Sequence, residues 1–90
     1  MPYFAVICRD KPGALPVRME NRAAHLAYIE ETGAVFLGGP LLENGQMAGS
    51  LLVLDLADLD AAQAWAANDP YAKAGLFDSV TINEWKKVIG

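Results

Sequence analysis

The sequence contains only one cysteine and one histidine among its 90 residues. Cys8 has no second cysteine with which to form a disulfide or share a metal, which suits a reducing compartment. No basic segment precedes the apolar run from Tyr3 to Cys8, and this run is too short for a signal-peptide core or a membrane span. We therefore expect a cytoplasmic protein with no membrane partner and no export route.

Basic residues are also few, because seven Lys and Arg residues stand against eleven Asp and Glu residues. The net charge of −4 argues against a nucleic-acid partner, since such proteins normally carry a basic face that neutralises phosphates. The positive charge is concentrated near the N-terminus, at Arg9, Lys11, Arg18 and Arg22. A local patch of this kind in an acidic protein favours a small anionic ligand.

Metal-ligand clusters and nucleotide-binding motifs are absent from the sequence. One histidine, one cysteine and scattered acids do not supply the grouped ligands that a zinc or iron centre needs. No phosphate-loop, dinucleotide-binding or nucleophile-elbow pattern occurs either. We predict that the protein uses no metal and no cofactor.

The chain is rich in apolar residues, which make up 53% of it, and it has no low-complexity tract. Its length predicts one small domain over residues 1–90, and such a chain buries only roughly 60–65% of the surface exposed in its unfolded form. We expect a packed globule that buries part of its apolar surface against a partner.

The first third of the chain predicts a strand, a loop and a helix. Tyr3 to Cys8 is rich in aromatic and β-branched residues and is apolar on both faces, as in a buried strand. Residues 11–16 hold two prolines and a glycine and predict a loop. Val17 to Thr32 fits a helix that ends at Gly33. The predicted buried face of this helix consists of Met19, Ala23, Leu26 and Ile29.

The middle of the chain predicts two strands joined by a hairpin. Ala34 to Leu37 begins a strand that Gly38-Gly39-Pro40 interrupts with a bulge or a strand end, where the backbone can approach a ligand. Asn44-Gly45 accepts the positive φ angles of a tight hairpin turn. The apolar run from Ser50 to Leu56 is typical of a central strand that is covered on both faces.

The last third predicts a helix, a short helical turn and a strand. Asp58 is the expected N-cap of a helix that runs through Asn68. Asp69-Pro70-Tyr71 predicts a new helical turn, because proline is favoured at the first helical position. Phe77 to Trp85 predicts the final strand.

The order strand, helix, strand, strand, helix, strand predicts an α+β protein with the ferredoxin-like split βαβ fold. In this fold a four-stranded antiparallel sheet carries two main helices on one face. Because the helices cover one face only, the apolar second face needs a partner. We expect a homodimer that packs sheet to sheet as a dimeric α+β barrel.

Several residues allow two interpretations. His25 lies one helical turn beyond Arg22, so it is either a packed helix-edge side chain or an acid/base group near cations. Arg18 is interpreted as a surface arginine that is either solvated or paired with Glu20 and nearby acids, whereas Arg22 is expected nearer the core, where it can bind a carboxylate or an enolate. Tyr71 and Phe77 either belong to the core or line a pocket for a planar ring. Cys8 is interpreted as a buried small hydrophobe.

The chain resembles the YciI-like (YCII-related) family over nearly its whole length. The matching stretches are residues 8–13, 21–28, 38–42, 49–51 and 68–77. The resemblance implies a ferredoxin-like homodimer whose active site contains a histidine and an aspartate, which here are His25 and Asp69. It also implies kinship with dimeric α+β barrel enzymes such as muconolactone isomerase and with a dehydrochlorinase of chlorinated hydroquinones. Ala23 departs from the family, in which many members have proline.

The resemblance favours a functional hypothesis for these residues. Asp69 would orient His25, which would transfer a proton on a small anionic or cyclic substrate, as in isomerase, lactone or elimination chemistry. Helix capping by Asp69 is an alternative that can coexist with this role. A metabolite-binding or regulatory module without catalysis is the other hypothesis. The expected substrate-binding residues are Arg22, Gly39, Pro40, Tyr71 and Phe77.

Overall fold

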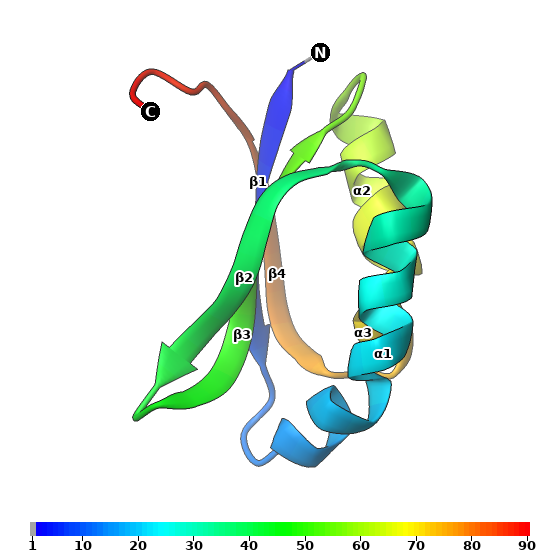
Figure 1. The fold of residues 1–90 in the computed structure, drawn as a ribbon, viewed down its shortest axis with the longest axis vertical. Coiled ribbons are helices and arrows are strands. Elements are labelled where there is room, and N and C mark those ends of the chain that lie inside the picture. The colour runs from blue at the N-terminus through cyan, green and yellow to red at the C-terminus, as the bar shows by residue number, and fades with distance from the viewer. Residues whose placement is uncertain (1) are drawn as a thin grey trace.

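In a computed structural model, residues 2–90 are described, and they form an open antiparallel sheet with helices on one face (Figure 1). The strands are β1 (Tyr3–Asp10), β2 (Val35–Glu43), β3 (Gln46–Asp55) and β4 (Phe77–Trp85), in the order β2-β3-β1-β4. The helices are α1 (Leu15–Thr32), α2 (Leu59–Asn68) and α3 (Pro70–Lys73). The predicted ferredoxin-like α+β fold is confirmed.

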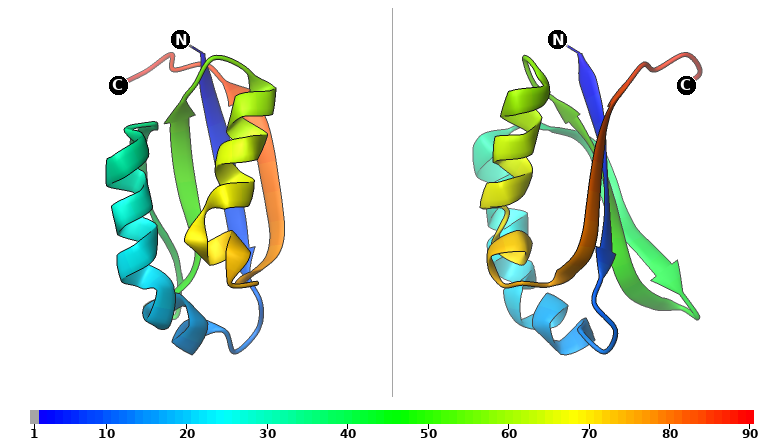
Figure 2. Two further views of the ribbon diagram at one scale, coloured as in Figure 1. Left: turned by 90° about the vertical axis from the view of Figure 1, so that its right-hand side faces the viewer. Right: turned by 180° about the vertical axis from the view of Figure 1, so that it is seen from behind.

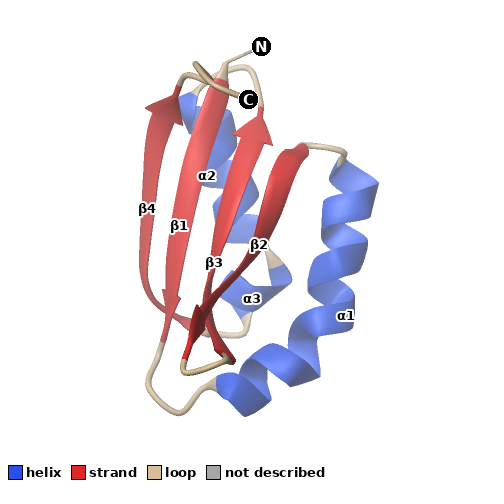
Figure 3. Cartoon of the chain, turned by 60° about the vertical axis from the view of Figure 1, so that its left-hand side comes forward, coloured by secondary structure: helices blue, strands red, loops and turns tan. Residues whose placement is uncertain are grey.

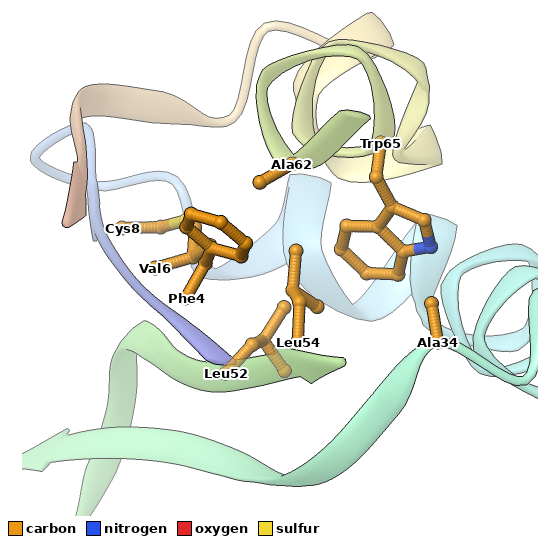
Figure 4. Close-up of a cluster of buried hydrophobic side chains, with 8 residues drawn as sticks. All are labelled: Phe4, Val6, Cys8, Ala34, Leu52, Leu54, Ala62 and Trp65. Carbon is orange, nitrogen blue, oxygen red and sulfur yellow. The ribbon is translucent and has the colours of Figure 1, made fainter. Parts of the chain in front are cut away.

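The core lies between the two central strands and α2. β1 pairs with both β3 and β4, so its alternate side chains Phe4, Val6 and Cys8 point toward the helices. They pack against side chains of β3 and α2, as Figure 4 shows. The other members of this cluster are Ala34, Leu52, Leu54, Ala62 and Trp65. Burying each large apolar side chain contributes about 1.5–3 kcal/mol, so this cluster is the main stabilising element of the domain.

Local sequence signals account for most of the element boundaries. Gly33 has a φ of 60° and its N–H donates to the carbonyl of Ile29, which ends α1 as predicted. Asn44 and Gly45 both have positive φ and form the predicted hairpin turn. The side chain of Asp58 accepts the N–H of Ala61 at 2.8 Å and caps α2. Each of these boundaries depends on a residue whose own chemistry favours it.

Two boundaries differ from the predictions. α1 begins at Leu15 rather than Val17, because Pro16 lies in the first turn, where a helix needs no N–H donor. β2 continues through Gly38-Gly39-Pro40, and its irregularities lie on either side, at Val35/Leu37 and Leu41/Leu42. An edge strand tolerates proline because one side of it has no strand to pair with.

The predicted buried face of α1 is wrong. Met19 and Leu26 are 53% and 46% exposed, whereas Arg18 and His25 are only 3% and 6% exposed. α1 packs mainly against α3 and lies over the β2 side of the sheet, while α2 lies over β1 and β4 (Figure 2). The inward face of α1 is partly polar. Asp69 supplies a hydrogen-bond partner for His25, and Asp10 and Ser50 supply partners for Arg18. Tyr28 and Ile29 of the same helix pack against the apolar core.

The second face of the sheet is open, as the view in Figure 3 shows. It presents apolar side chains from the central strands, among them the partly exposed Ile7 and Leu51. Tyr3 stacks on Phe36 with ring centroids 4.7 Å apart and also contacts Trp85 at 6.1 Å. None of the helices in the described residues 2–90 is long and apolar enough to cross a membrane.

Candidate active site

His25 and Asp69 meet in the structure although they are 44 residues apart in sequence. His25 lies on the inward face of α1, and Asp69 lies at the junction between α2 and α3. Nδ1 of His25 is 2.7 Å from Oδ1 of Asp69, and both side chains are buried. Because a carboxylate accepts hydrogen bonds, Nδ1–H is the donor and Nε2 is the nitrogen with a free lone pair.

Asp69 also caps α3, so the two roles expected for it coexist. The N–H of Tyr71 donates to Oδ1 of Asp69 at 2.9 Å. The same oxygen thus accepts hydrogen bonds from both the imidazole and the backbone. The turn at Pro70 therefore holds the carboxylate in place, and the carboxylate in turn orients the imidazole.

Tyr71 forms the wall against which His25 lies. Its ring is buried and stacks on the imidazole with a centroid distance of 3.9 Å and an interplanar angle of 15°. Phe77 contacts Tyr71 edge-on at 6.1 Å. Phe77 does not line the cavity beside His25, so it supports this wall from behind rather than forming part of it.

Arg18 is buried and pairs with Asp10, so the expected surface location is wrong, and the acid that pairs with it is not Glu20. Its Nε donates to Oδ2 of Asp10 at 2.7 Å, and its Nη2 donates to Oδ1 of Asp10 and to Oγ of Ser50, both at 2.9 Å. Burial alone would lower the pKa of Arg18, but the hydrogen bonds and charge of Asp10 outweigh it and raise the pKa overall. The guanidinium lies over the ring of Tyr71, 4.7 Å from its centroid.

The hydroxyl of Tyr71 remains protonated near neutral pH. Burial raises the pKa of Tyr71, while the nearby charges of Arg18 and Arg22 act in the opposite direction and do not cancel it. A neutral phenol can donate one hydrogen bond to a ligand. Tyr71 therefore supplies a donor beside two guanidinium groups.

Cys8 lies beneath this site as part of the core, as predicted. Burial, followed by the charge of Asp69, raises the pKa of the thiol to about 12. The thiolate is the reactive form of cysteine, and almost none of it forms near neutral pH. Cys8 is therefore a packing residue and not a nucleophile.

A cavity of about 240 Å³ opens beside His25, between α1 and the β2–β3 hairpin. Arg22, Gly39, Pro40 and Tyr71 line it, as expected of substrate-binding residues. Its polar end carries His25 and the arginines, and its apolar end consists of Leu26, Ile29, Val35 and Leu52. Pockets for drug-sized ligands measure roughly 300–1,000 Å³, so this cavity suits a compact ligand.

The lining residues that were not predicted to belong to the site include Arg18, Gly38 and Ser50. Arg18 lies two helical turns before His25 and hence on the same side of α1, a spacing that would have found it. A side chain at Gly38 would collide with Leu52, so the glycine keeps the cavity floor open. Ser50 had no signal in the sequence. Arg22 is exposed at the mouth of the cavity and not near the core as expected.

No group of three or more His, Cys, Asp or Glu side chains that could hold a metal ion occurs within residues 2–90.

Residues 2–86 match the YCII-related domain. The chain belongs to the YCII-related family. This YCII-related protein is 32% identical to Protein YciI of Escherichia coli, over 94% of this chain and 97% of that one. It is 33% identical to an uncharacterized protein of Haemophilus influenzae, over 96% and 98% of the two chains.

A solved structure of high similarity is the 5-chloro-2-hydroxyhydroquinone dehydrochlorinase TftG of Burkholderia phenoliruptrix, in complex with 2,5-dihydroxybenzoquinone. It is 38% identical to this YCII-related protein, covers 93% of each chain and has a TM-score of 0.87. An antibiotic biosynthesis monooxygenase is 9% identical, covers 99% of this chain and 100% of its own, and has a TM-score of 0.62. The second likeness shows a shared fold alone.

Proposed function

We propose that this YCII-related protein is a small-molecule enzyme in which His25, oriented by Asp69, transfers a proton on a compact anionic or cyclic substrate. The observation that carries this proposal is the 2.7 Å hydrogen bond between two buried side chains at the wall of a cavity. It occupies Nδ1 and leaves Nε2 as the basic nitrogen. The likeness to a dehydrochlorinase supports chemistry of this class.

The proposed mechanism begins with binding in the cavity beside His25. Nε2 removes a proton from the substrate, and the imidazolium that forms is stabilised by the carboxylate of Asp69. The face of the Tyr71 ring, 3.9 Å from the imidazole, also favours a positive charge there. In an elimination, the electron pair of the broken C–H bond then expels the leaving group. An isomerisation or a lactone reaction would use the same proton transfer without the departure of a leaving group.

Negative charge that develops on the substrate needs hydrogen-bond donors. The Tyr71 hydroxyl and the Arg22 guanidinium lie at the polar end of the cavity, where they can stabilise an enolate or phenolate oxygen. Donors that are already oriented before the reaction cost no reorganisation during it. Gly39 and Pro40 shape the opposite wall of the cavity on β2.

The test is an activity screen with small acids, lactones and halogenated phenols, followed by variants of the dyad. His25→Gln and Asp69→Asn are expected to lower kcat/KM by about 10²–10⁴-fold, the usual contribution of a general base. Circular dichroism and the thermal midpoint must show that both variants are folded. A folded His25→Gln protein with full activity would overturn the proposal. A ligand that binds at His25 and is recovered unchanged would instead favour a binding module.

We also propose that a second copy of the chain covers the open sheet face. The exposed apolar side chains Ile7 and Leu51 and the aromatic cluster of Tyr3, Phe36 and Trp85 support a sheet-to-sheet homodimer. Analytical ultracentrifugation is expected to give twice the chain mass. Ile7→Glu is expected to produce folded monomers, and a wild-type monomer at micromolar concentration would rule out the interface.

A further inference from the structure

The two arginines that line the cavity differ in how their charge is balanced. Arg18 forms a bidentate ion pair with Asp10, and a third hydrogen bond to Ser50 holds it in place. Both members of this pair are buried, so its net charge toward the cavity is zero. Arg18 therefore shapes the cavity and contributes little attraction for an anion.

Arg22 has no such partner. Within the described residues 2–90, no carboxylate lies within ion-pairing distance of its guanidinium. Its side chain is exposed, lines the cavity mouth and acts electrostatically on Tyr71. The polar end of the cavity thus has one unbalanced positive charge next to one neutral phenol donor.

The rest of the cavity cannot accept a second negative charge. Its other end is lined by Ile29, Val35 and Leu52, which offer no hydrogen-bond donor. The remaining hydroxyl, that of Ser50, is buried and already accepts a hydrogen bond from Arg18, so it carries no charge that could balance a second anion. Behind His25 lies the carboxylate of Asp69, which would repel an anion placed on that side. A second charge on the ligand would be buried without a partner, and this is strongly unfavourable.

We propose that the cavity selects a singly charged anion with an apolar body, whose anionic oxygen is bound by Arg22 and the Tyr71 hydroxyl. This inference deepens the proposed function, on which it rests, by naming the charge class of the substrate. It places the anionic oxygen at the cavity mouth and the apolar body against Ile29, Val35 and Leu52. The reacting carbon then lies beside His25, between these two ends.

Three probes of similar size and different charge test the proposal on the whole protein. Benzoate is a monoanion, benzamide is its neutral isostere and phthalate is a dianion at pH 7.5. Isothermal titration is expected to show benzoate binding at least tenfold more tightly than either of the others, a difference of about 1.4 kcal/mol. Equal affinity for benzoate and benzamide would overturn the proposal, and so would the absence of benzoate binding at millimolar concentration.

Two substitutions, each of which removes one positive charge, test whether Arg22 causes the preference for benzoate. Arg22→Gln is expected to reduce the preference for benzoate to less than about threefold. Lys86→Gln also removes one positive charge, at an exposed position that follows β4 and does not line the cavity, and it is expected to leave the preference intact. An equal loss in both variants would mean that the general field of the protein, and not Arg22, attracts the anion.

The failure of this proposal can be told apart from the failure of the proposed function. The probes carry no leaving group, so their binding is measured without turnover. Selective benzoate binding in a protein that turns over no substrate would support the inference and contradict the proposed catalysis. Turnover that depends on His25, with equal binding of benzoate and benzamide, would support the proposed catalysis and contradict the selection of a singly charged anion.

Discussion

Replacing Arg18 with methionine should destabilise the protein far more than replacing an ordinary arginine. Methionine keeps much of the length of the side chain but leaves the carboxylate of Asp10 buried without its bidentate partner. Removing one member of a buried ion pair costs about 3–5 kcal/mol. Domains of this size have free energies of unfolding of about 5–15 kcal/mol, so a large fraction of the stability is lost.

The structure also predicts how the effect depends on Asp10. In the Arg18→Met/Asp10→Asn double variant no charge is left without a partner. The loss should therefore be smaller than the sum of the two single losses, with a coupling energy of about 0.5–3 kcal/mol. Lys86→Met is the control, because Lys86 is exposed after the end of β4 and its substitution should change stability by less than about 0.5 kcal/mol.

Urea denaturation followed by circular dichroism measures these differences, since the urea dependence gives the free energy of unfolding of each variant. The wild type and all of its variants must show similar slopes, so that the change reflects stability and not a different unfolded state. The reasoning is refuted if Arg18→Met costs less than about 1 kcal/mol, because a buried pair cannot lose so little. Strict additivity of the two single variants would refute it equally.

Three further predictions concern Tyr71 and Cys8. Tyr71→Phe keeps the ring that stacks on His25 but removes the hydroxyl donor, and it should lower kcat/KM by about 10²-fold in an activity assay, whereas Tyr71→Leu also removes the ring and should lower kcat further; equal kcat values in the two variants would contradict the role of the ring. The Cys8 thiol should not react with a disulfide reagent in the folded protein at pH 8 and should react fully in urea. Because its folded pKa is raised from 9.0 to about 12, its stabilising contribution is complete below pH 9 and is lost as the pH rises toward 12, which pH-dependent unfolding of wild type and Cys8→Ala would reveal.

Most of the fold was predictable because its elements carry local signals. Gly33 ends α1 and Asn44-Gly45 forms the hairpin, since both need positive φ angles. Asp58 caps α2, and α3 begins at Pro70 with Asp69 as its N-cap. These signals depend on one to three neighbouring residues, so no tertiary information is required to find them.

The site was predictable only in part. From the residues alone His25 was as compatible with packing as with chemistry, and the resemblance to a family pointed to Asp69 as its partner. A hydrogen bond between residues 44 positions apart depends on how α3 docks against α1, which no local pattern encodes. Ser50 was missed for the same reason, because its hydrogen bond with Arg18 joins α1 to β3.

The sequence by itself determined most of the boundaries of the strands and helices, their order along the chain and the presence of one histidine as the candidate base. Only the tertiary structure decided which face of α1 turns inward. Hydrophobic periodicity assumes that apolar side chains point to the core, and it placed Met19 and Leu26 there. Packing against α3 and β3 turned Arg18 and His25 inward, because Asp10, Ser50 and Asp69 supply the hydrogen bonds that make their burial favourable.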